Sequence, residues 1–304
     1  MNLKATWSVL SVLLAGLLAV ASLATAPAHA QEQLAGTLAK ARETGAITIG
    51  YRESSVPFSY LNARKEPIGY SIELCRALVT AIEDTVNKSL AIKWVPVTSD
   101  SRIDAVASGK VDLECGSTTN NLERQKRVSF SPTMFVSGTK VLVKKGAPIK
   151  SFRDLAGKKV AVTAGTTNEK TLRELSEKFK LGINLQVARD HAESFGLVKS
   201  GQADAFATDD VLLYGLIAQD AAKSDYEVVG DFLSYDPYGI MYRKGDAQLA
   251  KVVNDTFQVL AEDGEIERQY KRWFLRKLPS GESINLPMSA QLETIIQTMS
   301  VKAE

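Results

Sequence analysis

One stretch of twelve residues, ECGSTTNNLERQ at 114–125, places several short hydrogen-bonding side chains just before an arginine. It follows an apolar, strand-like run at 111–113, so we expect Arg124 to lie in the first turn of a helix over 122–128. A positive charge at that end of a helix opposes the macrodipole. A bound anion would remove the conflict, because backbone N–H groups, threonine hydroxyls and the guanidinium would converge on it. The stretch therefore predicts an anion site around Arg124.

The hydroxyl and amide side chains of this stretch have a simpler interpretation, which is helix capping at about 1 kcal/mol each. We expect capping to account for Thr118, Asn120 and Asn121. Capping gives no reason for Arg124, for which the alternative is an arginine exposed to solvent.

Three other polar turns also follow strand-like runs, at 51–55, 164–169 and 208–210. In open α/β sheets, ligands bind beyond the carboxyl ends of the strands. Because all four turns would occupy such ends, we expect them to face one cleft.

The elements that would carry these turns alternate between short β-rich runs and amphipathic stretches, which is typical of α/β layers. The expected strands are at 47–50, 91–97, 111–115, 160–163, 183–188 and 203–208. The expected helices are at 69–82, 102–108, 122–128, 169–178, 193–199 and 211–219.

Two extended runs, at 134–143 and 233–240, are interrupted by glycine or proline. A chain that leaves one lobe once and returns once has two such crossings, and hinges are built from such element ends. We therefore expect two α/β lobes, followed by a tail at 278–304 with a short helix near 290–299. The lobes would comprise 46–137 plus 236–277, and 139–233.

Six segments spread over nearly all of the chain beyond residue 46 carry a resemblance to a known family. They are GYRESSVPFSY, GYSIEL, ECGSTTNNLERQKRVSFS, GTTNEKTL, RDHAESF and FATDDVLL. In these motifs the chain resembles the periplasmic substrate-binding proteins of ABC amino-acid importers (solute-binding protein family 3), most closely the glutamate/aspartate-binding group. The resemblance implies the type II periplasmic binding protein fold, in which two α/β lobes are joined by two hinge crossings. It implies no cofactor and no catalysis.

The function implied by this resemblance is capture of L-glutamate or L-aspartate in the periplasm by hinge closure, and delivery to an ABC permease in the inner membrane. In the family's pattern the ligand's α-carboxylate would be held by Arg124 together with Ser117, Thr119 and Thr167. Asp209 would bind its ammonium group.

An acidic ligand carries a second carboxylate, and Arg52, Arg102 and His191 match the family positions that would hold it. Charge supports an acidic ligand, because three arginines and one aspartate leave about +2 to face a ligand of net charge −1. A neutral ligand would leave the surplus arginines unpaired, which is costly when they are buried.

Structural roles are open for several of these residues. Arg52 could pair with Glu53, and Arg102 with Asp100. His191, which is the one histidine beyond residue 30, could cap a helix.

The aromatic side chains have two interpretations. Phe58, Tyr60 and Tyr70 could line the ligand or belong to the core. Trp273 and Phe274 are expected to pack a helix onto the first lobe.

Three other functions compete with glutamate or aspartate transport. The chain could bind another polar amino acid, act as a periplasmic enzyme of the dehydratase type, or pass a closed state to a signalling partner. A single histidine beyond the leader, with no metal-ligand cluster and no phosphate-binding glycine loop, argues against triad, zinc and nucleotide chemistry.

The first thirty residues are predicted to be an export signal. They contain Lys4, an apolar run at 7–24 and the small-residue pattern Ala28-His29-Ala30, so we expect cleavage after Ala30. The alternative is an uncleaved membrane anchor. Lys4 is the only charge in this segment, and with 37 basic and 35 acidic residues in the whole chain the remainder is nearly neutral. That balance argues against a nucleic-acid partner.

The chain has two cysteines, Cys75 and Cys115. Both would lie in the first lobe of an exported protein, where a disulfide can form. The alternative is a pair of buried thiols.

Overall fold

The computed structural model describes residues 33–301. The predicted export signal at 1–30, with its cleavage after Ala30, lies outside the described residues. No helix within 33–301 is long and apolar enough to cross a membrane.

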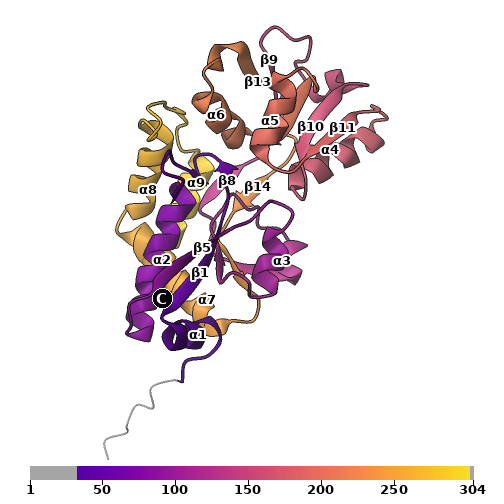
Figure 1. Ribbon diagram of the computed structural model, residues 1–304. Coiled ribbons are helices and arrows are strands. Elements are labelled where there is room, and N and C mark those ends of the chain that lie inside the picture. Colours follow the sequence, from indigo (N-terminus) through magenta and orange to yellow (C-terminus); the bar gives the residue numbers. More distant parts are fainter. Residues whose placement is uncertain (1–32, 302–304) are drawn as a thin grey trace, which may run out of the picture. The chain divides into compact units, whose positions relative to one another are not determined.

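A five-stranded mixed sheet organises the first part of the fold, in the strand order β5-β1-β6-β15-β7. Figure 1 labels β1 and β5 of this sheet. β1 pairs in parallel with β5 and β6, whereas β15 runs antiparallel to β6 and β7. The strands are β1 (Ala46–Tyr51), β5 (Ala91–Pro96), β6 (Leu113–Glu114), β7 (Val128–Phe130) and β15 (Met241–Arg243). The accompanying helices are α1 (Gly36–Thr44), α2 (Tyr70–Val86), α3 (Arg102–Ala107), α7 (Ala247–Glu262), α8 (Glu265–Tyr270), the π-helical η4 (Lys271–Leu275) and α9 (Ala290–Met299).

Apolar side chains pack against both faces of this sheet. Successive side chains of a strand point to opposite faces. Tyr242 of β15 packs in the core that contains Ile47 and the helices α1, α2 and α7. Its neighbour Met241 packs instead with Val106 of α3. A small antiparallel sheet follows β1 in the chain and consists of β2 (Ser54–Ser55), β3 (Ser59–Leu61) and β4 (Pro67–Ile68).

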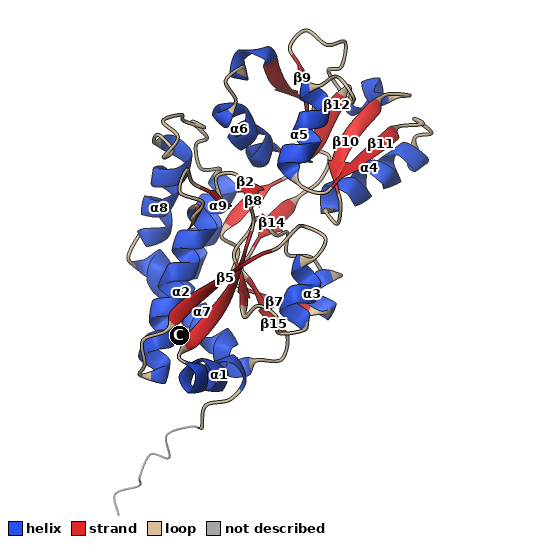
Figure 2. Cartoon of the chain, in the orientation of Figure 1, coloured by secondary structure: helices blue, strands red, loops and turns tan. Residues whose placement is uncertain are grey.

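A second five-stranded sheet has the order β11-β10-β12-β9-β13 (Figure 2). β10 is parallel to β11 and β12, and β9 runs antiparallel to β12 and β13. The strands are β9 (Thr139–Lys144), β10 (Lys159–Thr163), β11 (Asn184–Ala188), β12 (Ala205–Asp209) and β13 (Tyr226–Val229). The helical elements are η2 (Phe152–Leu155), α4 (Thr167–Lys178), α5 (His191–Lys199), α6 (Asp210–Gln219) and η3 (Lys223–Asp225).

The same alternation divides the core around the second sheet. Val160 of β10 packs with Leu172 of α4. The next residue, Ala161, packs with Phe195 of α5 on the other face. The second sheet therefore has its own two apolar layers.

Within the two runs expected to cross between lobes, at 134–143 and 233–240, β8 (Phe135–Ser137) and β14 (Asp236–Tyr238) form an antiparallel pair. β14 also bridges to Thr119, which ties the crossing to the polar stretch at 114–125. The short helix expected near 290–299 is confirmed as α9, and its Leu292 and Ile296 are buried in the first core.

The helix expected over 122–128 is wrong. The chain forms only the 3-10 turn η1 (Arg124–Lys126), and β7 begins at Val128. The Asn121 side chain accepts the Arg124 backbone N–H at 2.9 Å, and Val128 pairs with Arg243 of β15. The residues that would continue a helix are thus paired in the sheet. Because only a single 3-10 turn forms, the argument from the helix macrodipole does not apply to Arg124.

The aromatic residues Phe58, Tyr60 and Tyr70 belong to the core, with exposed fractions of 3% or less. The phenol of Tyr70 donates a hydrogen bond to the Met134 carbonyl at 2.9 Å. Phe274 stacks edge-on against Phe58 with ring centroids 5.5 Å apart, as expected of a helix packed onto this part of the fold.

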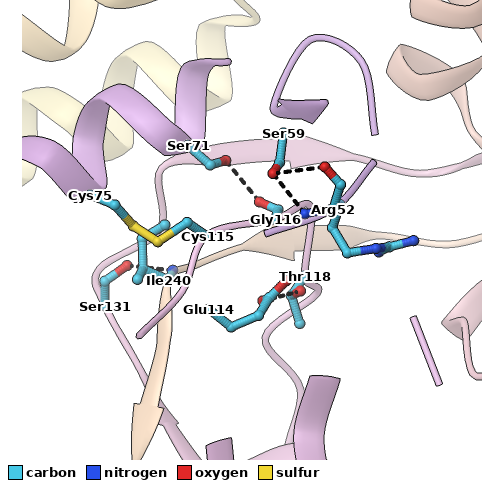
Figure 3. The surroundings of a disulfide bond; sticks show 10 residues. All are labelled: Arg52, Ser59, Ser71, Cys75, Glu114, Cys115, Gly116, Thr118, Ser131 and Ile240. Carbon is cyan, nitrogen blue, oxygen red and sulfur yellow. Dashed lines mark hydrogen bonds between the residues drawn. A yellow bond between two sulfur atoms is a disulfide. The ribbon is translucent and has the colours of Figure 1, made fainter. Parts of the chain in front are cut away.

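A disulfide joins Cys75 in α2 to Cys115, which directly follows β6 (Figure 3). One turn earlier in the same helix, the Ser71 hydroxyl donates to the Gly116 carbonyl at 2.7 Å. The start of the polar stretch is therefore fixed to α2 by one covalent bond and one hydrogen bond.

Candidate functional site

The eight predicted site residues lie where strands of the two sheets end and the following turns begin. Arg52 follows β1, Ser117 and Thr119 follow β6, and Asp209 ends β12. Arg102, Thr167 and His191 are the first residues of α3, α4 and α5, and Arg124 begins η1. All but Thr167, which is partly exposed, are buried.

Arg124 reaches from the first sheet's turn to the second sheet's turn. Its Nη1 donates to the Thr119 carbonyl at 2.8 Å, and its Nη2 to the Gly165 carbonyl at 3.3 Å. Burial, followed by the charge of Arg102, lowers the pKa of Arg124 to about 9, which leaves it charged at neutral pH. A cavity of about 420 Å³ opens beside it, lined also by the cations Arg127 and Lys170.

Arg52 is the least satisfied charge among the described residues of the site. Its guanidinium is 1% exposed, yet neither Nη1 nor Nη2 has a hydrogen-bond partner in the described chain. Burial, followed by Arg102, lowers its pKa to about 9. The alternative pairing with Glu53 does not occur within residues 33–301. A buried guanidinium of this kind requires an anion to offset its desolvation.

Arg102 does not pair with Asp100 either. Its Nη1 donates to the Ser117 carbonyl at 3.1 Å and to the Thr118 hydroxyl at 2.6 Å, while its Nε has no partner among the described residues. Burial lowers the pKa of Arg102. The Thr118 hydroxyl in turn donates a hydrogen bond to Oε2 of Glu114 at 2.7 Å (Figure 3). Thr118 therefore links two buried charges and does not serve as a cap.

Two threonines, one from a turn of each five-stranded sheet, donate hydrogen bonds to the same carboxylate, Asp236 of β14. The hydroxyls of Thr119 and Thr167 donate to its Oδ1 at 3.0 and 2.9 Å. The Ser234 hydroxyl donates to Oδ2. Thr119 and Thr167 are themselves 3.3 Å apart through their hydroxyl oxygens, so the two predicted carboxylate-binding turns are in contact.

Asp209 accepts hydrogen bonds from two directions. The Asn168 amide donates to Oδ1 at 2.9 Å, and the Tyr238 phenol donates to Oδ2. Burial, followed by the nearby charge of Asp236, raises the pKa of Asp209 to about 8. In this arrangement the carboxyl is mostly protonated at neutral pH.

His191 is buried and does not cap its helix, because the Asp190 side chain accepts the capping N–H of Glu193 at 3.0 Å. Its Nδ1 lies 2.9 Å from the Thr163 hydroxyl. Burial, followed by the charges of Arg52 and Arg102, holds the pKa of His191 well below its usual range, so the imidazole is neutral.

Sequence reasoning missed several buried polar residues in and near this cluster, including Asn168 and Tyr238, which donate to Asp209. The hydroxyl of Ser99 is buried and has no partner in the described chain, as is also true of the Ser117 hydroxyl. Ser99 follows β5, so the strand-end rule applied to one more turn would have found it. Glu114 ends β6 as Asp209 ends β12, so the same rule would have found it, whereas the buried Asp236 begins β14 and gave no such signal.

The charge count made from sequence must be corrected accordingly. Three arginines face not one carboxylate but three, Glu114, Asp209 and Asp236. Because the pKa of Asp209 is about 8, the cluster carries about +1 at neutral pH in this arrangement. The ligand-free cluster is therefore positively charged toward an incoming ligand of net charge −1. No group of three or more potential metal ligands occurs within residues 33–301.

Comparisons with known proteins agree with this architecture. An ancestral amino-acid-binding protein described as a precursor of cyclohexadienyl dehydratase superposes with a TM-score of 0.67 at 33% identity, covering 78% of this chain and 99% of that one. An ancestral arginine-binding protein bound to arginine gives a TM-score of 0.69 at 30% identity, with coverage of 76% and 98%. The expected two-lobed α/β fold of type II periplasmic binding proteins is confirmed.

Sequence relatives are closer. The L-glutamate/L-aspartate-binding protein of Pseudomonas aeruginosa is 46% identical over 287 residues, which is 93% of this chain and 95% of the relative. The glutamate/aspartate import solute-binding protein of Escherichia coli is 41% identical over 269 residues, or 88% and 89% of the two chains. The model of the bacterial extracellular solute-binding proteins, family 3, matches residues 47–276. The chain therefore belongs to the bacterial extracellular solute-binding proteins of family 3.

Proposed function

We propose that this protein binds L-glutamate or L-aspartate in the periplasm and delivers it to an ABC permease in the inner membrane. The observation that carries the proposal is the Arg52 guanidinium, which is buried without a partner in a cluster of net positive charge. The names of the relatives from P. aeruginosa and E. coli specify the same two amino acids. Binding without catalysis is part of the proposal.

Each ligand group has a matching set of side chains. The α-carboxylate lies against Arg124, Ser117, Thr119 and Thr167, and the ammonium group lies against Asp209. An arginine fork suits a carboxylate because it can donate two parallel hydrogen bonds.

The side-chain carboxylate of the ligand is held by Arg52, Arg102 and His191. This pairing supplies an anion to the unpartnered Nη atoms of Arg52 and to the free Nε of Arg102. The neutral imidazole of His191 contributes a hydrogen bond and no charge.

Binding proceeds by closure of two lobes, 46–137 plus 236–277 and 139–233, about the crossings β8 and β14. The first lobe presents the three arginines, and the second brings Thr167, His191 and Asp209 onto the ligand. Closure removes water from the charges, which strengthens their hydrogen bonds. The closed form is the one delivered to the permease.

Calorimetric titration of the purified, ligand-stripped protein with a panel of amino acids tests the function. Glutamate or aspartate should bind much more tightly than glutamine, asparagine or arginine. Preference for a neutral or basic amino acid would contradict the proposal and would favour the same fold serving another polar ligand.

An enzymatic role is the second candidate, and it is favoured by the relation of one structural neighbour to a dehydratase. Prolonged incubation with glutamate, followed by mass spectrometry, separates the two functions. Unchanged ligand supports binding alone, whereas a new product would assign catalysis.

Export of the chain is part of the same proposal. The leader would be removed after Ala30, so the protein recovered from the periplasm should have a mass that corresponds to residues 31–304. A mass that includes residues 1–30 would indicate the membrane anchor instead.

Ligand affinity should increase with pH between 6 and 8 because of Asp209. Its pKa of about 8 means that the free site holds a proton on this carboxyl, and a bound ammonium group favours the ionised form. Binding below pH 8 therefore releases about one proton, and affinity falls as the pH decreases. Titrations at pH 6, 7 and 8 in two buffers of different ionisation enthalpy measure both effects.

Asp209→Asn should bind more weakly and lose this pH dependence. An unsubstituted protein whose affinity is constant from pH 6 to 8 would show that Asp209 does not receive the ammonium group.

A further inference from the structure

Helix α6 of the second lobe approaches the small β2 sheet of the first lobe. α6 and β2 are in contact, and Val211 and Leu212 of the helix belong to the same apolar core as Val56 and Phe58. One turn beyond these residues, Gly215 faces the backbone of Val56. The contact lies next to the site, because Arg52 precedes β2 and Asp209 precedes α6.

The approach at Gly215 leaves no room for a side chain. A Cβ built on Gly215 would lie 2.2 Å from the Val56 carbonyl oxygen and 2.8 Å from its carbonyl carbon. Real Cβ atoms essentially never come closer than 3.0 Å to another heavy atom, and the obstructing atoms here are backbone. Either α6 or the β2 segment would have to withdraw.

Conformation does not explain the glycine. Gly215 lies inside α6 and has no positive φ, so any residue could adopt its backbone geometry. Glycine is a weaker helix former than alanine at such a position. What requires glycine there is the contact between the lobes.

A second close approach lies at the turn that precedes α4. A Cβ on Gly165 would be 2.6 Å from Cα of Asp100, again across the two lobes. Gly165 also has a φ of +71°, so its replacement would strain the backbone in any arrangement. Gly215 is therefore the position at which closure alone can be tested.

We propose that Gly215 is a positioning residue for ligand binding, because its missing side chain lets α6 reach Val56 and so sets how far the lobes close. The proposal rests on the proposed function. A methyl group at 215 holds α6 away from the first lobe, and with it Asp209, which directly precedes the helix. An open arrangement of the lobes relieves the clash, so the fold itself tolerates the substitution.

Gly215→Ala tests this directly, and Gly196→Ala is its matched control. Gly196 also lies inside a helix of the second lobe, α5, and a Cβ there would meet nothing within 4 Å. Gly196→Ala should keep or raise the melting temperature of the ligand-free protein, and Gly215→Ala should remain folded with a cooperative thermal transition. Calorimetry with the amino acid that the unsubstituted protein binds should give a Kd at least tenfold higher for Gly215→Ala and unchanged for Gly196→Ala.

A second measurement does not depend on the ligand's identity. Lys170 of α4 pairs with Glu123 of the first lobe at 2.8 Å, and both side chains are exposed. The double variant Glu123→Cys/Lys170→Cys, treated with a short bis-maleimide, reports how often the lobes close. Adding Gly215→Ala should slow this cross-linking severalfold, whereas adding Gly196→Ala should not.

Equal cross-linking rates with and without Gly215→Ala would overturn the inference, as would wild-type affinity in Gly215→Ala. A lowered melting temperature together with an unchanged cross-linking rate would assign Gly215 to core packing instead. If neither the unsubstituted protein nor Gly196→Ala binds acidic amino acids, the proposed function is contradicted. The cross-linking rates still decide the role of Gly215 in that case.

Discussion

Replacing Arg124 with alanine is expected to abolish binding of every amino-acid ligand, acidic or neutral. In the proposed binding mode this side chain holds the α-carboxylate that all of them share, and it donates to the carbonyls of Thr119 and Gly165 in the turns of the two sheets. Breaking a buried charge pair costs about 3–5 kcal/mol, which is roughly a 10²- to 10⁴-fold loss of affinity. Calorimetry with glutamate, aspartate and glutamine measures the loss.

Arg127→Ala is the matched control for this substitution. Arg127 lies three residues further on, is exposed, and pairs with Asp104 at 2.6 Å. It should retain the affinity of the unsubstituted protein to within about 1 kcal/mol, since exposed pairs contribute little. Micromolar binding by a folded Arg124→Ala protein would remove Arg124 from the α-carboxylate site.

Replacing Arg52 with methionine should change ligand preference more than binding itself. The methionine fills part of the same buried volume without charge, so a ligand with a side-chain carboxylate loses its partner. We expect glutamate and aspartate to lose about 3–5 kcal/mol of binding free energy, and glutamine and asparagine to change by only about 1 kcal/mol. Titration of the variant with all four amino acids gives the ratio.

An exposed arginine provides the comparison. Arg64 pairs with Glu66 on the surface at 3.0 Å, and Arg64→Met should leave the preference unchanged. Equal losses of binding free energy for acidic and neutral ligands in Arg52→Met would mean that Arg52 does not bind the side-chain carboxylate. Arg102→Met is expected to behave as Arg52→Met does, with an added loss of stability from its bonds to Ser117 and Thr118.

The gathering of polar side chains from separate turns into one cluster could be predicted from sequence because it follows a local rule. Polar residues at the ends of strands, such as Asp209, and in the turns that follow them, such as Thr167, face the same edge of an α/β sheet whatever the details of packing. The assignment of individual ligand groups to these residues stays a prediction.

The electrostatic reason given for the position of Arg124 was wrong. It assumed a helix over 122–128, which pairing between β7 and β15 prevents, and β15 lies more than a hundred residues further along the chain. Local signals cannot register such a competition between helix and sheet.

The contacts of the carboxylates Glu114 and Asp236 were missed for a related reason. Glu114 is the last residue of β6, and only the tertiary structure shows that Thr118 links it to Arg102. Asp236 lies in β14, more than a hundred residues beyond Thr119, and there accepts hydrogen bonds from hydroxyls in the turns of both sheets. A charge count therefore needs the tertiary structure, even when the arginines are correctly chosen.

The link between Cys75 and Cys115 has a practical consequence for how the protein is obtained. It closes a segment of 40 residues, and such a constraint on the unfolded chain stabilises the fold by about 4 kcal/mol in the chain-entropy model. Chains kept in a reducing cytosol would lack it, and the backbone that leads into Ser117 would then be tethered to α2 by the Ser71 hydrogen bond alone. Protein purified from the cytosol and protein secreted into an oxidising compartment would thus differ in this disulfide. Their ligand affinities should be compared only after the free thiols of each preparation have been counted.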